Sequence, residues 1–455
     1  MEVPSYVKKD YKDDSITKTL VIEFPDLSLT VPTEEVYSES MRLYESILEH
    51  ESIEFVGCIA SKFEVQIRNT ATYQKVLKGQ RIVASIYTEN TENYPIPLFH
   101  GIVDECKKEI NKQYVKITAY DELYTKGNID VSSWYKNLHF PITLGNLRTS
   151  LLSTMGLTCV ECTLPNDNVS ISKQYNPESL QSLVVLKSIC QINGCFGIIN
   201  RDGLFEFRFL EQTLNAIYPS INLIPSSGTY PGGESESPYE DAEIMSYYRT
   251  LEYQDFDVKP VDKITIRQKE NDKGVTYGSG DNNYIIQANM FTYKLSNTTL
   301  KTVAKNIYSK VGAISYSPYQ SVSNGLPYAE CGKNAVAFYY SPGSQEPTQN
   351  KDFYIFNREL TGIQALKDNY ESKGEEYQNE FITDINSRVR TIQSSQNEET
   401  IEYDDKFDAI DSEFTDVWNA IESGGNFNIV STNGVPSSPL PNTLYCIQGE
   451  IISVR

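Results

Sequence analysis

The chain has 455 residues, which is too many for a single hydrophobic core and implies several domains. Its 61 Asp and Glu residues outnumber its 40 Lys and Arg residues. The resulting formal charge of −21 excludes a surface that wraps nucleic acid through many phosphate contacts. The 32 tyrosines favour a strand-rich protein whose half-buried positions take aromatic side chains.

The eight cysteines are scattered along the chain, and the first residues lack the charged and apolar regions of a secretory signal. We therefore expect reduced thiols and synthesis in a cytoplasm. No window approaches the roughly 18 uninterrupted apolar residues that a membrane-spanning helix needs. We expect no insertion into a membrane.

Up to about residue 120, apolar and polar side chains alternate with the period of half-buried strands. The apolar positions of four such runs are Leu20, Ile22 and Phe24, then Phe63, Val65 and Ile67, then Ile82, Ala84 and Ile86, then Val115, Ile117 and Ala119. Polar or glycine-bearing breaks separate the runs. The pattern predicts an antiparallel barrel or curled sheet in residues 1–130.

Residues 131–215 have a different pattern, which predicts a small α+β unit. Apolar residues between Leu144 and Met155 are spaced for a helix, and Gly156 follows where a left-handed residue ends one. A second helix is expected from Asn176 to Gly194. A hairpin with a turn at Asn200–Gly203 follows, in which Gly203 supplies a positive φ.

Residues 216–240 are rich in Ser, Pro, Gly and Glu and indicate a linker or surface loop. Residues 241–358 show strand-like runs again and predict a second β-rich domain. A helix from Asn297 to Val311 is expected within it, ended by Gly312.

Residues 359–423 carry apolar side chains at heptad spacing, which indicates a coiled-coil helix. Helical residues numbering about 60 make a rod of roughly 90 Å, which buries its seam only against partner helices. Aromatic and β-branched seam residues favour three strands over two. The expected trimerisation seam is Ile363, Leu366, Tyr370, Tyr377, Phe381, Ile385, Val389, Tyr403, Phe407, Ile410, Phe414, Val417 and Ile421. A short tail, residues 424–455, ends in a strand.

Candidate catalytic and metal-binding residues are few. The three histidines, His50, His100 and His139, lie in separate elements and have no second ligand at metal spacing. Four cysteines, at positions 159, 162, 190 and 195, are numerous enough for zinc, but their loose spacing favours free thiols. Acidic pairs such as Asp104-Glu105 arise by chance in so acidic a chain. We expect no catalytic residue, cofactor or metal.

The order and spacing of several segments form a more specific pattern than any one of them. These segments are "VLKGQRIVASIY", "IPLFHGIVDE", "YVKITAYDELY", "ESLQSLVVLKSICQINGCFGIINRDGLFEF", "YIIQANMF", "TLKTVAKNIYSKV", "YSPYQ" and "FYIFNRELTGIQALKDNYESKGEEYQ". Together they resemble the baseplate hub or tail-tip proteins of tailed bacteriophages. The resemblance is to the amino-terminal structural region of tail-associated proteins of phages of Gram-positive bacteria, and it covers about residues 15–380.

The resemblance implies a β-rich α+β, multidomain chain. Two tube-like antiparallel β-barrel domains, residues 1–130 and 241–358, would flank the inserted α+β domain and the linker. It also implies that Gly101 lets a strand bend in the barrel wall, so that this glycine resists substitution. His100 beside it would do no chemistry.

The function that the resemblance implies is structural. Three subunits would form a virion hub that closes the distal tail tube, adapts a sixfold tube to a threefold tip and lines the DNA-ejection channel. The partners would be the tail tube or distal tail ring, the tape-measure protein, and a spike or fibre; DNA would be met only in transit. The hub would be made in the host bacterial cytoplasm. The net negative charge is compatible with a lumen that repels DNA.

Two alternatives remain open from the sequence. One is a tail-associated cell-wall hydrolase, either a peptidase or a muramidase. The other is a receptor-binding fibre component that is anchored by its coil.

Overall fold

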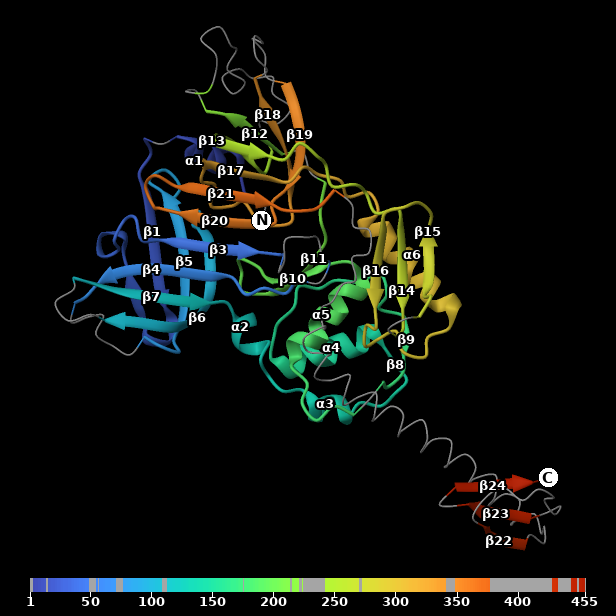
Figure 1. Ribbon diagram of the computed structural model, residues 1–455. Coiled ribbons are helices and arrows are strands. Elements are labelled where there is room, and N and C mark those ends of the chain that lie inside the picture. Colours follow the sequence, from blue (N-terminus) through green and yellow to red (C-terminus); the bar gives the residue numbers. More distant parts are fainter. Residues whose placement is uncertain are drawn as a thin grey trace. The chain divides into compact units, whose positions relative to one another are not determined.

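The computed structural model describes residues 3–376, except residues 14, 49–54, 56, 71–76, 109–112, 175, 213–214, 221–222, 224–241, 270–271 and 341–347. It also describes residues 428–432, 443–447 and 450–454. The chain divides into two compact units, Met1–Ile385 and Asn386–Arg455. Most of the first unit is built on one large sheet (Figure 1).

The first half of this sheet contains seven antiparallel strands, which pair in the order β3, β4, β7, β6, β5, β1, β2. The strands are β1 (Lys18–Phe24), β2 (Leu29–Val31), β3 (Arg42–Ser46), β4 (Lys62–Arg68), β5 (Arg81–Thr88), β6 (Ile96–Lys108) and β7 (Tyr114–Tyr120). Short 3-10 helices follow β1 (Pro25–Leu27) and β2 (Thr33–Glu35). The bridge between Val36 and Ile67 brings the chain after β2 back to β4, so this half of the sheet curls.

The apolar positions expected in this half face its core. Leu20, Phe63, Ile82 and Ile117, one from each of the four runs, are each fully buried. Alternation with period two therefore located the strands and also identified their buried sides.

Gly101 lies inside the long strand β6, which pairs antiparallel with its sequence neighbours β5 and β7. Irregular pairing in β6 falls on either side of it, between Ala84 and Ser85 on β5 and between Val103 and Glu105. A Cβ atom added at Gly101 would press against the carbonyl oxygen of Tyr120. A glycine is therefore required at position 101 because there is no space for a side chain. The irregularities in the pairing of β6 lie at neighbouring positions and not at Gly101.

The second half of the sheet contains another seven strands, in the order β19, β18, β12, β13, β17, β21, β20. They are β12 (Ala216–Pro219), β13 (Met245–Tyr253), β17 (Tyr319–Asn324), β18 (Asn334–Tyr339), β19 (Thr348–Tyr354), β20 (Asn357–Thr361) and β21 (Lys367–Ser372). This half is mixed, because β12 runs parallel to both β13 and β18. The expectation of a purely antiparallel second domain, with residues 216–240 wholly a linker, is therefore wrong.

The two halves join edge to edge through β20 and β3 to form a single 14-stranded sheet. These two strands pair antiparallel, with Arg358 opposite Glu45 and Leu360 opposite Leu43. We call this junction the seam. Backbone hydrogen bonds across the seam make the two halves one continuous wall.

The coiled-coil helix expected from residue 359 does not begin there, because β20 and β21 occupy the start of that region. Ile363, Leu366 and Tyr370 are buried in the core of the second half and belong to no helix. Their helical spacing arises from two short strands around a tight turn, in which Gly362 has a φ of 81°. The remaining expected positions of the coil lie outside the described residues: Tyr377, Phe381, Ile385, Val389, Tyr403, Phe407, Ile410, Phe414, Val417 and Ile421.

The inserted α+β region follows the expected order of helices and hairpin. Its elements are α2 (Glu122–Lys126), α3 (Ser132–Lys136), β8 (Ile142–Thr143), α4 (Leu144–Met155), β9 (Ser170–Ile171), α5 (Ser182–Asn193), β10 (Phe196–Ile199) and β11 (Phe205–Arg208). Both left-handed ends, Gly156 and Gly194, are confirmed. Helix α5 starts later than expected because Leu180 and Gln181 are held extended by pairing with residues 130–131.

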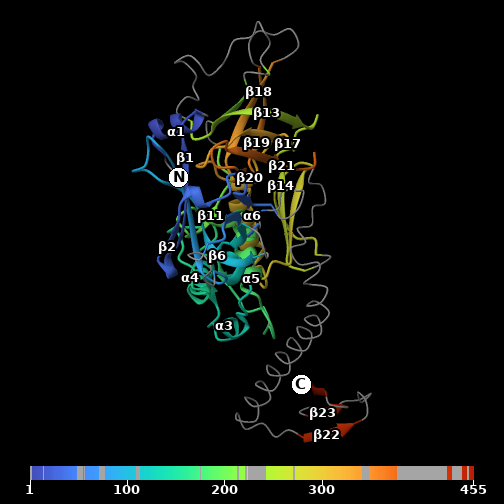
Figure 2. The same cartoon turned by 90° about the vertical axis from the view of Figure 1, so that its left-hand side faces the viewer.

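A second small α+β piece lies within the residues expected to form only the second barrel. It contains β14 (Lys263–Arg267), β15 (Val275–Gly278), β16 (Asn283–Gln287) and α6 (Asn297–Val311), which packs on this small sheet (Figures 1 and 2). Asn289 donates hydrogen bonds to the carbonyl oxygen of Ser188 and the side chain of Gln191, both on α5. This piece therefore packs with the inserted region and is separate from the large sheet.

Helix α1 (Ser5–Lys12) connects the two halves near the chain start. Its buried Tyr11 donates a hydrogen bond to the carbonyl oxygen of Ile86 in the first half, and its ring meets Tyr328 in the second. Lys8 donates to the carbonyl oxygen of Ala242, just before β13. Figure 2 shows this helix beside β1.

The second unit contains a three-stranded sheet of β22 (Asn428–Thr432), β23 (Thr443–Ile447) and β24 (Glu450–Val454). Among the described helices of the whole chain, none is long and apolar enough to cross a membrane.

Replacing Gly101 with Ala is expected to lower the free energy of unfolding by about 1–3 kcal/mol, because the added methyl group overpacks the contact with Tyr120. Thermal unfolding measures the loss. Gly79→Asn serves as a control: Gly79 has a φ of 81° with nothing within 4 Å, and Asn tolerates that conformation. Equal losses in both variants would contradict the packing explanation.

Candidate functional site

The candidate site is one face of the large sheet, which runs across the seam. Along six neighbouring strands, side chains point alternately into the core and onto the opposite face of the sheet. Among the described residues, every side chain on that opposite face is at least partly exposed except Thr118, which is buried. We call this opposite face the open face. Its positions are Gln320, Val322 and Asn324 on β17; Lys367, Asn369 and Glu371 on β21; Asn357, Glu359 and Thr361 on β20; Arg42, Tyr44 and Ser46 on β3; Lys62, Glu64, Gln66 and Arg68 on β4; and Tyr114, Lys116, Thr118 and Tyr120 on β7.

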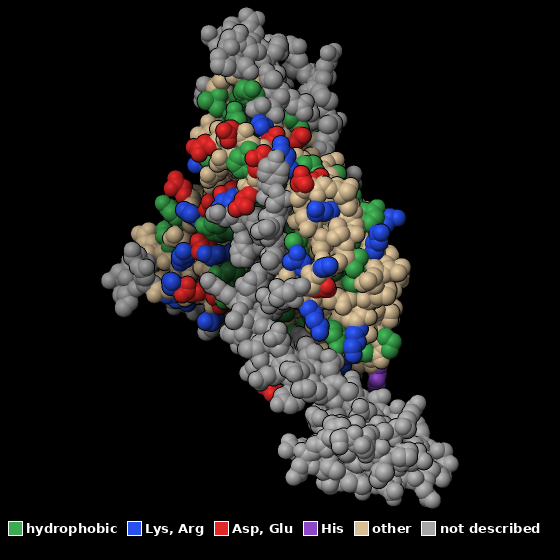
Figure 3. All heavy atoms as spheres, turned by 45° about the vertical axis from the view of Figure 1, so that its right-hand side comes forward, with side chains coloured by type: hydrophobic (Ala, Val, Ile, Leu, Met, Phe, Trp, Pro, Cys, Tyr) green, Lys and Arg blue, Asp and Glu red, His purple; other side chains and the backbone are tan. Residues whose placement is uncertain are grey.

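The open face is polar, and its charge differs from that of the chain. Val322 is its one aliphatic residue. Five basic and three acidic residues give it a formal charge of +2, against −21 for the whole chain. Lys and Arg lie among Asp and Glu on the described surface in Figure 3. The overall acidity of the chain is therefore not a property of this face.

Carboxylates hold most of the basic side chains of the open face. Glu64 Oε1 lies 2.7 Å from Lys62 Nζ and 3.5 Å from Lys116 Nζ. Burial alone would raise the pKa of Glu64, but the hydrogen bond from Lys62 and the charge of Lys116 lower it. Arg68 pairs with Glu35 at 3.3 Å. Glu64 is thus ionised at neutral pH and is shared by two lysines.

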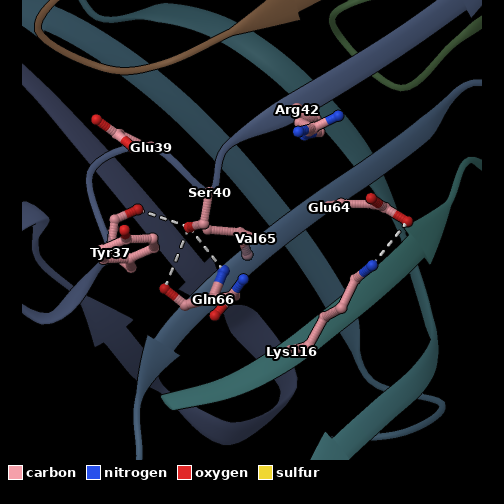
Figure 4. Close-up of a pocket in the computed structure, with 8 residues that line it drawn as sticks. All are labelled: Tyr37, Glu39, Ser40, Arg42, Glu64, Val65, Gln66 and Lys116. Atoms are coloured by element: carbon pink, nitrogen blue, oxygen red, sulfur yellow. Dashed lines mark hydrogen bonds and ion pairs between the residues drawn. The ribbon is translucent and has the colours of Figure 1, made fainter. Parts of the chain in front are cut away.

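A hollow lies over β4 and β7 beside these ion pairs. In Figure 4, Glu64 and Lys116 point toward each other on its rim. Ser40 Oγ donates to the carbonyl oxygen of Tyr37 at 2.6 Å and accepts from the Gln66 amide at 2.9 Å, which fixes the loop at its other side. The remaining lining residues are Glu39, Arg42 and Val65.

Polar side chains also cross the seam on the open face. Asn369 on β21 donates a hydrogen bond to Glu359 on β20, and Glu359 pairs with Arg42 on β3 at 3.4 Å. In parallel, Asn357 on β20 contacts both Glu371 on β21 and Ser46 on β3. The seam is therefore bridged by side chains as well as by the backbone.

Beneath the seam, on the core side, Arg358 is completely buried. Its guanidinium bonds to both oxygens of Asp368 on β21, at 2.7 and 3.2 Å, and to Glu45 on β3 at 2.9 Å. It also donates to the carbonyl oxygens of Leu326 and Ala329. Charge-assisted bonds to two carboxylates offset the cost of burying this cation.

The inserted region reaches the same point through the β10–β11 turn. Arg201 in this turn bonds to Glu45 at 2.8 Å, to the carbonyl oxygen of Leu98 on β6, and to that of Ala329. Glu45 thus accepts two arginines, one from the second half of the sheet and one from the inserted region. Three parts of the chain meet at one carboxylate.

A further buried arginine lies beside this network. Arg208 on β11 pairs with Glu206 at 2.8 Å and with Glu330 at 3.4 Å, and it donates to the carbonyl oxygen of Cys331. Burial would raise the pKa of Glu330, but Arg208, aided by Arg201, lowers it to about 2. Glu330 therefore stays ionised throughout the physiological range.

Gly101 and Gly203, which the sequence predicts to be structurally important, lie near each other here. Gly203, with a φ of 76°, closes the β10–β11 turn beside His100 of β6, the neighbour of Gly101. Burial lowers the pKa of His100, although Asp202 opposes this. His139 is exposed, and His50 lies outside the described residues.

The four cysteines considered for zinc lie near one another in pairs, Cys159 beside Cys162 and Cys190 beside Cys195. Cys190 Sγ also lies 3.5 Å from Cys58 Sγ, and Cys195 Sγ donates to the carbonyl oxygen of Cys190. Cys162 lies beside Arg148. Within the described ranges, no three His, Cys, Asp or Glu side chains are arranged to hold a metal ion.

The buried network was missed in the sequence. Arg358 lies between Asn357 and Glu359, and Glu45 lies beside Ser46, so charged side chains in polar stretches gave no local signal of burial. The open face did carry a signal, because Arg42, Glu64 and Lys116 occupy the polar positions of period-two runs. The alternating runs could not predict the order of the strands in the sheet, and so could not show that these residues share one face.

No protein-family model matches the chain, and no curated protein matches it. Solved structures do resemble it. The 43 kDa tail protein of prophage MuSo2 from Shewanella oneidensis has a TM-score of 0.49 and 9% identity, over 79% of this chain and 98% of that chain. A tail protein from Neisseria meningitidis MC58 has a TM-score of 0.45 and 8% identity, over 79% and 98%. Prophage tail protein gp18 from Listeria monocytogenes EGD-e has a TM-score of 0.42 and 13% identity, over 79% of this chain and 95% of that chain.

Replacing Arg358 with Met is expected to cost about 3–5 kcal/mol, because it leaves the buried Asp368 without its cation and Glu45 with Arg201 alone. Arg42→Met is the matched control, since Arg42 is half exposed and its ion pair spans the same seam. That change should cost about 0–1 kcal/mol. Thermal unfolding compares the two variants, and similar losses would contradict a seam held from the core side.

Asp121, which caps α2, gives a pH-dependent contribution to stability. Burial raises its pKa to about 7, although the amides of Ser61 and Leu123 donate to it and oppose the rise. The folded state then keeps a proton that the unfolded state releases near pH 4. The contribution is full at low pH and is lost as the pH rises from about 4 to about 7.

We therefore expect the thermal midpoint of the native chain to fall relative to that of Asp121→Asn between pH 5 and pH 8. Asp130→Asn is the control, because Asp130 is exposed and its hydrogen bond from Ser132 lowers its pKa. The contribution of Asp130 to stability no longer changes with pH above about pH 4. The thermal midpoint of Asp130→Asn should therefore change with pH in parallel with that of the native chain. A constant difference between the native chain and Asp121→Asn would contradict the assignment.

Proposed function

We propose that the chain is a structural protein of a bacteriophage tail tip or baseplate. In this proposal three copies form a hub that closes the distal end of the tail tube, adapts a sixfold tube to a threefold tip and lines the channel through which DNA leaves. The observation that carries the proposal is the continuous 14-stranded sheet, made of two seven-stranded halves that meet at the seam.

The symmetry argument follows from that sheet. Each chain supplies two seven-stranded halves, so three chains around an axis supply six. A ring of six such halves would match a sixfold tube on one side, while the remainder of each chain repeats only three times. The sequence resemblance to phage hub proteins supports the same arrangement.

The open face suits the wall of a water-filled channel. A channel wall needs its backbone groups paired and its side chains polar, and a closed sheet meets both needs. Among the described strands, β2 and β19 end the sheet. Pairing or packing between such edges of neighbouring copies would continue the wall around the axis.

The partners proposed for this hub are a second and third copy of the chain, the tail tube or distal tail ring, the tape-measure protein, and a spike or fibre docked through the coil and tail. The proposed location is the tail tip of the virion. Rotationally averaged images of isolated particles test this. A ring with near-sixfold inner and threefold outer symmetry is expected, and a ring of any other order would contradict it.

The expected coil gives a second test. Phe407→Asp with Phe414→Asp places charges at the apolar contact positions of the coil and should convert trimers to monomers or unstable aggregates in sedimentation. Ser412→Asp with Asn419→Asp adds the same charge on the outer side of the expected coil and should leave the mass of the assembly unchanged. Trimers that survive the first pair of substitutions would show that the coil does not hold the hub together.

A further inference from the structure

The open face presents a physical problem that rests on the proposed function. A wall that passes DNA should not bind it, yet this face has a formal charge of +2 and carries Lys and Arg on four of its strands. Free cations on such a wall would exchange the counterions of DNA for direct phosphate contacts and hold the duplex in place.

We propose that three carboxylates, Glu64, Glu359 and Glu35, act as clamps that keep the basic side chains of the open face from gripping DNA. Each lies against a cation that would otherwise be available to a phosphate. Glu64 holds Lys62 and Lys116, Glu359 holds Arg42, and Glu35 holds Arg68.

The exposures show how a clamp works. The Glu64 side chain is 12% exposed, whereas Lys62 and Lys116 are 33% and 47% exposed. The carboxylate therefore lies at the base and the two ammonium groups lie over it. Glu359 is likewise less exposed than Arg42, at 25% against 51%. A phosphate that approaches either kind of cation meets the carboxylate behind it.

The clamps are held in place by neutral donors and by the sheet itself. Glu359 Oε2 accepts a hydrogen bond from Asn369 while its other oxygen faces Arg42. Glu64 lies on β4 opposite Arg42 on β3 and opposite Thr118 on β7. Because regular pairing fixes these positions, four of the five cations on the face, all except Lys367, each lie beside a carboxylate.

The arrangement yields a wall with fixed, mixed charges instead of a uniformly acidic one. Repulsion from a strongly acidic wall would oppose the entry of DNA, and free cations would stop its movement. Paired charges in a polar surface avoid both effects, since the field of a close pair falls off over a short distance.

The test uses the full chain and a short DNA duplex of arbitrary sequence, with fluorescence anisotropy between 50 and 200 mM salt. The variant Glu64→Gln with Glu359→Gln releases Lys62, Lys116 and Arg42. Each released cation should add about 0.9 to the slope of log affinity against log salt. Three of them predict an affinity that falls about fortyfold over this salt range, whereas the native chain should show no measurable binding.

Two controls separate the clamp from simpler explanations. Glu92→Gln with Glu178→Gln removes two exposed carboxylates away from the open face, so it matches the change in net charge. It should gain no affinity. The proposal would be overturned if the clamp variant gained no affinity for the duplex, or if this control gained as much affinity as the clamp variant. It would also be overturned if the native chain bound the duplex as tightly as the clamp variant does.

Accessibility and folding are checked separately. The cations of these ion pairs are a third to a half exposed, and surface ion pairs contribute about 0–1 kcal/mol, so the clamp variant should unfold within a few degrees of the native chain. The clamp substitutions are also made in the Phe407→Asp, Phe414→Asp background, where the face of a single chain is open to the duplex. Binding there supports the clamp whatever the assembly proves to be, whereas the symmetry of the particle tests the hub.

Discussion

Arg358 lies fully buried where the two halves of the sheet meet, and its guanidinium bonds to carboxylates from both halves. A buried cation of this kind is tolerated only while its partners stay in position, so it constrains the register of β20 against β3. Glu45 then adds Arg201 from the inserted region. The relative placement of three parts of the chain depends on this one group of charges.

The open face follows from that constraint. Once β20 and β3 pair in register, the polar positions of both halves fall on the same side of one sheet, and side-chain bridges such as Asn369 to Glu359 to Arg42 cross the seam. A slip of one residue would turn these polar side chains into the core and bring apolar ones to the surface. The buried network and the polar surface therefore specify the same register from opposite sides.

The sequence predicted what depends on local patterns and missed what depends on distant pairing. Alternation found the strands of the first half, helical spacing located α4 and α6, and left-handed glycines marked the ends of α4 and α5. Leu366 and Tyr370 were misread because helical spacing also arises from two strands around a tight turn. The parallel strand β12 and the burial of Arg358 have no local signature, since both are decided by which strands become neighbours.

The proposed hub requires the open face to lie inside an assembly of three chains. This can be tested with an amine-reactive polymer that is too large to enter a tail lumen. Mass spectrometry then measures the modification of Lys116 and Lys367 in isolated particles and in the Phe407→Asp, Phe414→Asp variant. Both lysines are exposed in the single chain. Both lysines should react in the variant and be protected in the particle. Equal reactivity in both would place the open face on the outside and contradict it.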